Sequence, residues 1–333
     1  MAMRHFLLLI AVLLPVVIPV RAQDLAVNGP ELTEWMVPWE NTRPRDPIID
    51  ANGRVWFVGQ AGDYVASLNP QDGSFDRIDL QEGDGPHNVI VDAEGALWYA
   101  GNRAAHIGRI DPKTKEITRF PMPEGARDPH TLIFDHQGKL WFTVQGGNMI
   151  GRLDPATGDV KVRPVSQERS RPYGIVVAED GTPWVVLFGT NRLASIDPET
   201  MEITEHELPR PETRPRRLGI TSDGAVWYVD YAKGYLGRFD PATGDVKEWQ
   251  TPGGESSAPY AMAVDDQDRI WFVETGPNPN RFVGFDPASE SFFGITEIES
   301  GGGTVRHMIF DPESGVIWFG TDTNTIGSAL VRR

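Results

Sequence analysis

One tryptophan slot recurs seven times along this chain, and its period constrains the fold more than any other feature. Successive tryptophans are 42, 43, 43, 43, 44 and 47 residues apart. They are Trp56, Trp98, Trp141, Trp184, Trp227, Trp271 and Trp318. A repeat of about 40–45 residues built of short strands is typical of propeller blades. The spacing therefore predicts seven copies of one unit rather than two unrelated domains.

The third repeat shows what one unit contains. Four short runs with strand character, HTLIFD, KLWFTV, MIGRLD and DVKVRPV, are separated by turn residues. Asp135 and Gly138 favour the first turn, through an Asx-turn and a flexible backbone. Pro155 and Gly158 favour the last turn, because proline fixes φ and glycine tolerates positive φ. No convincing helical periodicity follows the first 22 residues. The fold class is therefore all-β, with four-stranded blades.

The two ends of the chain complete each other. The last repeat stops after its third strand, TIGSALV. The missing outer strand is found near the start, where ELTEWMVP (31–38) resembles EITEHELP (202–209) and DVKEWQTP (245–252). Pairing this segment with the last repeat would close the ring and remove exposed sheet edges. We predict a single seven-bladed β-propeller over residues 23–333.

Residues 1–22 are predicted to be an export signal. Arg4 precedes an apolar run from Phe6 to Val20, and Val20-Arg21-Ala22 offers small residues at the positions a signal peptidase reads. The run is short for a membrane span and contains two prolines, so an uncleaved anchor is the weaker alternative. Cleavage after Ala22 would place the protein in the periplasm or outside the cell.

Charge and cysteine content narrow the range of partners. The formal net charge is −16 and the chain has no cysteine. An acidic surface argues against nucleic acid as a partner, and disulfides contribute nothing to stability. We expect a monomer that binds a small molecule and has no stable membrane insertion once the signal is removed.

A ring of polar residues is predicted at one mouth of the central channel. The loops before each inner strand and after each tryptophan strand share one face of a propeller. The position that follows the repeat's proline, at the start of the inner strand, holds Arg45, His87, His130, Tyr173, Arg216 and Tyr260. In the last repeat, aligning VRHMIFD with PHTLIFD places Arg306 at this position. None of these is aliphatic, and each can donate a hydrogen bond. The ring is therefore the predicted ligand site.

The ring residues suggest two kinds of role. His87 and His130 lie in adjacent blades, both in a PH dipeptide, and are the candidate acid/base pair. The alternative is that each caps a strand and bonds a backbone carbonyl. The predicted substrate-binding residues are Arg45, Tyr173, Arg216, Tyr260 and Arg306. Guanidinium groups suit an anionic or carbonyl-rich ligand, although they could also offset crowded carbonyls and nearby acids. We expect His106, in a loop on the same face, to be solvated.

The quoted motifs PHTLIFDHQGKLWFT…NMIGRLDPATGDVK and PYGIVVAEDGTPW resemble the streptogramin (virginiamycin B) lyase family over nearly the whole mature chain. The resemblance implies a seven-bladed propeller that opens an ester-linked ring by elimination, using Mg²⁺, histidines in PH positions and nearby glutamates. It also implies Asp128, directly before Pro129-His130, and Glu274 as metal ligands. The family's histidines lie in its last two blades, where this chain has Tyr260 and Arg306.

Two function classes follow. The first is an exported carbon–oxygen lyase acting on a cyclic or ester-linked small molecule at the channel mouth. The second is a non-catalytic periplasmic propeller that binds an anionic ligand. A lactonase-type hydrolase is less favoured, because the sequence shows no convincing acidic metal cage at the channel.

Overall fold

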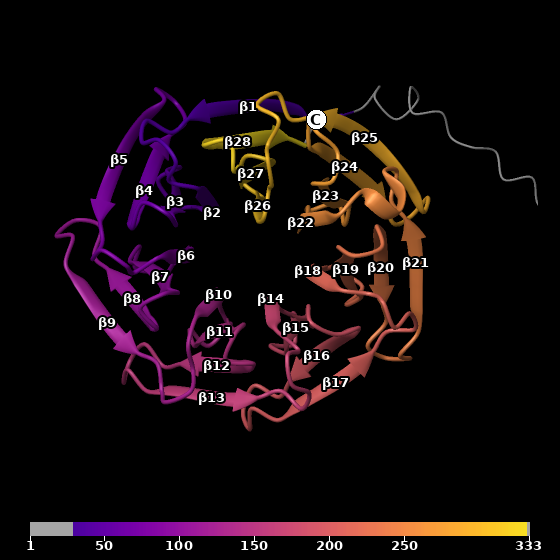
Figure 1. The fold of residues 1–333 in the computed structure, drawn as a ribbon, viewed down its shortest axis with the longest axis horizontal. Helices are drawn as coiled ribbons and strands as arrows, with labels where there is room; N and C mark the ends of the chain where they lie inside the picture. Colours follow the sequence, from indigo (N-terminus) through magenta and orange to yellow (C-terminus); the bar gives the residue numbers. More distant parts are fainter. Residues whose placement is uncertain (1–28, 332–333) are drawn as a thin grey trace, which may run out of the picture.

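Seven four-stranded antiparallel sheets form a closed ring around a central axis (Figure 1). The structure is a computed structural model that describes residues 29–331, so the predicted export signal at residues 1–22 lies outside the described residues. The prediction of an all-β, seven-bladed propeller is confirmed. Within residues 29–331 no helix is long and apolar enough to cross a membrane.

Each blade runs outward from the channel in chain order. Blade 1 holds β2 (Pro44–Ile49), β3 (Val55–Gly59), β4 (Tyr64–Asn69) and β5 (Ser74–Asp79). Blade 2 holds β6 (Pro86–Val91), β7 (Leu97–Gly101), β8 (His106–Ile110) and β9 (Ile117–Pro121). Blade 3 holds β10 (Pro129–Phe134), β11 (Leu140–Val144), β12 (Met149–Leu153) and β13 (Val160–Pro164). Blade 4 holds β14 (Pro172–Val177), β15 (Pro183–Leu187), β16 (Arg192–Ile196) and β17 (Ile203–Glu207).

The remaining blades follow the same order, and a short 3₁₀ turn, η2 (Gly254–Ser256), precedes blade 6. Blade 5 holds β18 (Pro215–Ile220), β19 (Val226–Asp230), β20 (Tyr235–Phe239) and β21 (Val246–Gln250). Blade 6 holds β22 (Pro259–Val264), β23 (Ile270–Glu274), β24 (Arg281–Asp286) and β25 (Ser291–Glu297). Blade 7 holds β26 (Met308–Asp311), β27 (Val316–Gly320), β28 (Thr325–Leu330) and, as its outer strand, β1 (Glu31–Met36).

The repeated tryptophan is anchored by the turn that precedes its strand. In blade 3 the Trp141 indole Nε1 donates to Asp135 Oδ2 over 2.7 Å. The other oxygen of Asp135 accepts the backbone N–H groups of Gln137 and Lys139, each at 2.9 Å, so one side chain both shapes the turn and satisfies a core indole. The same bond joins Trp56 to Asp50, Trp98 to Asp92, Trp271 to Asp265 and, through a hydroxyl, Trp227 to Thr221.

The glycine of the third strand leaves space for an aromatic ring of the second strand. Gly151 pairs across the sheet with Phe142, and a Cβ at Gly151 would overlap the Phe142 ring. Blade 2 repeats the arrangement with Gly108 beneath Tyr99. The W-(F/Y)…I-G-R pattern thus reflects packing of the second-strand aromatic ring over the third-strand glycine.

The ring closes as the sequence predicted. Strand β1 pairs antiparallel with β28, from Glu31 opposite Leu330 to Met36 opposite Thr325. The Glu34 carboxylate adds bonds from the Thr325 hydroxyl at 2.6 Å and the Ser300 N–H at 2.9 Å. The two ends of the chain are therefore held together by both backbone and side-chain contacts.

A β-bulge interrupts the inner strand of six blades just after its first residue or two. In blade 3 the pairing register shifts between Pro129 and Leu132, so His130 and Thr131 fall in the irregular segment. Equivalent shifts occur in β2, β6, β14, β18 and β22. A bulge re-aims side chains and breaks strict alternation, so two successive residues of one blade can reach the channel.

Candidate functional site

The structure brings the predicted ring residues together at one end of the channel. The rings of His87 and His130 have centroids 3.6 Å apart, and His130 lies 4.1 Å from Tyr173. The hydroxyls of Tyr173 and Tyr260 are hydrogen-bonded across the channel. The Arg216 guanidinium lies 3.8 Å from the centre of the Tyr260 ring. Blades 2 to 6 thus meet through direct side-chain contacts.

Most of these side chains fill the mouth rather than line an open cleft. Arg45, His87, His130, Tyr173 and Tyr260 are each no more than 5% exposed. Arg216 and Arg306 are partly exposed. A ligand approaching this end would therefore meet the two partly exposed arginines before the buried histidines.

A second polar layer lies directly beneath the ring and spans the channel. Asp46 accepts a hydrogen bond from Arg45 Nε at 3.0 Å and from Asn88 Nδ2 at 3.1 Å. Arg217 donates to Thr131 Oγ1 at 3.2 Å and to the Arg306 carbonyl at 3.0 Å. Its Nη2 lies 3.5 Å from Asp46 Oδ2. Burial alone would raise the pKa of Asp46, but Arg45, His307 and Arg217 hold that pKa well below its usual value.

Both predicted acid/base histidines are neutral at neutral pH. Burial, followed by the charge of Arg45, lowers the pKa of His87 well below 6.5. Burial and the charges of Arg217 and Arg45 do the same for the pKa of His130. A neutral imidazole has one unprotonated ring nitrogen that can accept a proton and one N–H that can donate a hydrogen bond. His87 Nδ1 is buried without a hydrogen-bond partner, while His130 Nδ1 is bonded to Thr131 Oγ1 at 2.9 Å.

The two tyrosines have opposite pKa shifts. Burial acts to raise the pKa of Tyr173, but the charges of Arg216, Arg217 and Arg45 outweigh it and lower that pKa. Burial and the neighbouring Tyr173 raise the pKa of Tyr260. Within this hydrogen-bonded pair, Tyr173 is thus the readier to ionise and Tyr260 the group that keeps its proton.

A second repeat position supports the arginines, and the sequence analysis missed it. In four blades the residue four places after the repeat tryptophan contacts an arginine of the ring. Arg45 Nη1 donates to Gln60 at 3.1 Å, and Arg306 Nη1 donates to Asp322 at 2.7 Å. Phe188 and Tyr231 lie 4.4 and 4.2 Å from the Arg216 guanidinium. The signal was the fixed spacing from the tryptophan, which places all four in one slot.

The predicted metal ligands Asp128 and Glu274 are not brought together. Asp128 accepts the N–H groups of Gly146 at 2.6 Å and Gly147 at 3.2 Å, and burial raises its pKa against these bonds. Glu274 is fully buried, accepts the Gly253 N–H at 2.7 Å and pairs with Arg281. Among residues 29–331 no group of three or more His, Cys, Asp or Glu side chains is placed to hold a metal ion. Since both carboxylates already have hydrogen-bond or ion-pair partners and lie apart, these donors do not fit a Mg²⁺ ion.

The expectation for His106 was wrong. The side chain is 5% exposed and its Nε2 lies 3.0 Å from the Tyr99 hydroxyl. Its ring packs over Gly101, where a Cβ would overlap it. The absence of a side chain at Gly101 creates the room that buries this histidine.

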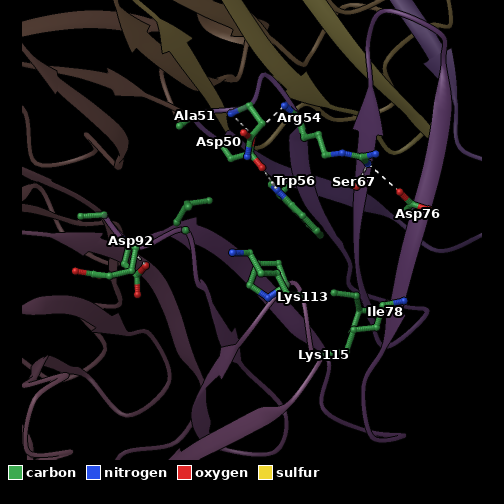
Figure 2. Close-up of a pocket in the computed structure, with 16 residues that line it drawn as sticks. Asp50, Ala51, Arg54, Trp56, Ser67, Asp76, Ile78, Asp92, Lys113 and Lys115 are labelled. Carbon is green, nitrogen blue, oxygen red and sulfur yellow. Dashed lines mark hydrogen bonds and ion pairs between the residues drawn. The ribbon is translucent and has the colours of Figure 1, made fainter.

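A groove lies between blades 1 and 2, beside the turns that join the first and second strands of each blade (Figure 2). Its volume is about 580 Å³. Its polar groups largely satisfy each other, because Trp56 donates to Asp50 at 2.8 Å and Arg54 donates to Ser67 at 2.9 Å and Asp76 at 2.8 Å. No predicted site residue lines it, and its contacts are those of the repeat's structural turn.

The fold and the converging polar ring define the class: a closed seven-bladed propeller with a candidate ligand site on its axis. The chain belongs to the Virginiamycin B lyase family, whose sequence profile matches residues 30–329. A virginiamycin B lyase from Staphylococcus aureus is similar in structure, with a TM-score of 0.81, 24% identity, and coverage of 90% of this chain and 98% of that chain. A catalytically inactive variant of that enzyme with quinupristin has a TM-score of 0.82 at 24% identity, covering 90% and 98% of the two chains.

More distant propellers share the architecture. The extracellular domain of a two-component system from B. thetaiotaomicron has a TM-score of 0.70 at 16% identity, covering 91% of this chain and 43% of that chain. A comparison with curated proteins finds no match. At these identities the structural similarities establish the fold alone.

Proposed function

We propose that this protein is an exported carbon–oxygen lyase that acts on a cyclic or ester-linked small molecule at the polar mouth of the channel. The observation that supports this proposal is the neutral His87–His130 pair held against arginines and a tyrosine pair. The predicted signal at residues 1–22 supports export, and extracellular domains occur among the structural neighbours.

The chemistry requires a base, a site for developing negative charge and a proton donor. A neutral imidazole of His130 or His87 would remove the proton from the carbon beside a carbonyl. The electron pair left on that carbon forms the C=C bond as the neighbouring C–O bond breaks. Arg216 and Arg306 would stabilise the charge that develops on the carbonyl oxygen. Tyr173, whose pKa is lowered, would donate its proton to the departing oxygen while the proton taken from carbon stays on the histidine, so atoms and charge balance without added water.

Tyr260 and Arg306 stand where the family resemblance placed histidines. We therefore propose that the base function lies in blades 2 and 3, and that the substrate differs from the streptogramins handled by the similar enzymes. The arginines favour a substrate with a carboxylate or several carbonyl oxygens.

The test is turnover of an ester and lactone panel that includes quinupristin, read by mass spectrometry. Elimination opens a ring with no change of mass, whereas hydrolysis adds one water. His130→Ala and His87→Ala should each lower kcat at least about 100-fold, the range for loss of a general base. His136→Ala, at an exposed turn, is the matched control. Full turnover in His130→Ala and His87→Ala would exclude these roles.

The second candidate, an anion-binding propeller without catalysis, is favoured by the number of arginines. Arg45, Arg216 and Arg306 converge here, with Asp46 as the carboxylate partner of Arg45 and Asp322 as that of Arg306. Affinity for an anionic ligand should then fall with salt and survive His130→Ala.

A further inference from the structure

The opposite end of the channel contains a cavity that the proposed function does not use. Its volume is about 550 Å³, within the range of small-molecule sites, which is about 300–1,000 Å³. All seven inner strands or their flanking residues contribute to it. Its partly exposed apolar lining includes Ile48, Ile90, Ile133, Ile220, Val264 and Ile309.

The inner end of this cavity is polar. Asn88, Thr131, Arg217 and His307 line it, while no residue of the predicted ring does. The second polar layer therefore separates the two ends of the channel: the ring lies on one side and the apolar cavity on the other.

One charged group dominates this polar end. Among the described lining residues Arg217 is the only Lys, Arg, Asp or Glu. Its guanidinium has five N–H donors, and the structure gives partners through Nε, Nη1 and Nη2, so donors remain for a further acceptor. Asp46, which offsets part of this charge, is not among the lining residues and is already bonded to Arg45 and Asn88.

His307 adds an unsatisfied polar atom. Its Nδ1 is buried and has no hydrogen-bond partner. Burial and the charge of Arg217 lower its pKa to about 4, so the ring is neutral at pH 7 and can donate or accept one bond. Although Nδ1 is enclosed, the His307 side chain as a whole is partly exposed and lines the cavity, so its imidazole is the second polar side chain next to Arg217 at this end.

We propose that this end of the channel binds a small aliphatic carboxylate, with its chain along the apolar wall and its carboxylate against Arg217 and His307. The wall supplies burial of apolar surface, worth about 25 cal/mol per Å². A guanidinium matches a carboxylate in shape and charge. This site is separate from the proposed lyase site, so either can fail without the other.

The probe is decanoate, below its micelle concentration, titrated into the full-length protein by calorimetry. 1-Decanol tests the chain without the charge, and decyltrimethylammonium tests the opposite charge. We expect decanoate to bind at least tenfold more tightly than either. Equal binding of all three would overturn the carboxylate assignment, and no binding of decanoate would overturn the site.

Ile133 offers a matched pair of variants, because it is partly exposed and lines the cavity. Ile133→Glu places a negative charge on the wall and should weaken decanoate at least tenfold. Ile133→Gln has nearly the same shape without the charge and should weaken it no more than about threefold. The melting temperatures of both variants are to be measured as the check that they fold. Equal loss in both, or no loss in Ile133→Glu, would contradict the proposed location.

Discussion

Acid should unfold this protein through its buried histidines. His307 has a pKa of about 4 in the folded protein against 6.5 when free, a difference of 2.5 units. At about 1.36 kcal/mol per unit, protonation of the unfolded state at low pH would remove up to about 3 kcal/mol from the free energy of unfolding. His87 and His130 shift in the same direction and add to the effect.

The sign follows from where each state binds protons. Above pH 6.5 both states hold these imidazoles neutral, and the full stability is present. As the pH falls below 6.5, the unfolded chain takes up protons that the folded chain refuses, so stability decreases towards the folded pKa. If all three histidines contribute, the slope approaches about 4 kcal/mol per pH unit. Asp46 acts in a lower window, because its depressed pKa stabilises the fold above pH 3.8 and that stability is lost below it.

The assay is urea unfolding followed by tryptophan fluorescence, at intervals from pH 7.5 to 4.5. His307→Gln should lower the slope by about one proton, or about 1.4 kcal/mol per pH unit. His136→Gln, at an exposed turn, is the control for a histidine outside the channel. A flat stability between pH 7 and 5, or the same change of slope in both variants, would refute the reasoning.

Three further predictions address the scaffold and the metal. Removing residues 23–42, and with them β1, should expose the edge of β28 and lower the melting temperature or cause aggregation, whereas a chain starting at residue 23 should match the full fold; equal melting temperatures would contradict the closure. Asp135→Ala should cost about 1–3 kcal/mol in urea unfolding, because the Trp141 indole loses its acceptor; Asp159→Ala, at an exposed turn of the same blade, serves as its control. The two predicted metal carboxylates are already bonded to backbone N–H groups, so Mg²⁺, Mn²⁺ and Ca²⁺ should change the melting temperature only slightly. A metal-dependent rise of several degrees would show a site that the described donors do not form.

The scaffold could be predicted from the sequence because the same local contacts recur in most repeats. The spacing of the tryptophans, the turn aspartates and the third-strand glycines depends on contacts within one blade, such as Asp135 with Trp141 and Phe142 with Gly151. The closing strand was also visible, since its pattern matches the other outer strands. Contacts within one blade can be predicted without knowing how the blades face each other.

The residues inside the channel could be predicted only in part from the sequence. Strict alternation along a strand predicts that the residue after each ring residue points away from the channel. The bulges break that rule, and Asp46 even has a positive φ of 49°, which nothing in its residue type requires. Arg217, which lies at a bulge, and His307, which lies just before β26 rather than within it, therefore went unrecognised as channel residues, although each directly follows a ring residue. Burial of the ring also depends on contacts between different blades, which no single repeat encodes.

Pseudo-symmetry would allow the proposed site to lie in different blades of the same fold. Every inner strand delivers one side chain to the same axis, so a pair of adjacent blades is geometrically equivalent to any other adjacent pair. Histidines in blades 2 and 3 can therefore meet as closely as histidines in blades 6 and 7, and the 3.6 Å separation of His87 and His130 shows that they do. What changes with rotation is the neighbouring blade: here His130 meets Tyr173 and, across it, Arg216. The identity of those neighbours, rather than the histidine pair alone, should determine which substrate the site accepts.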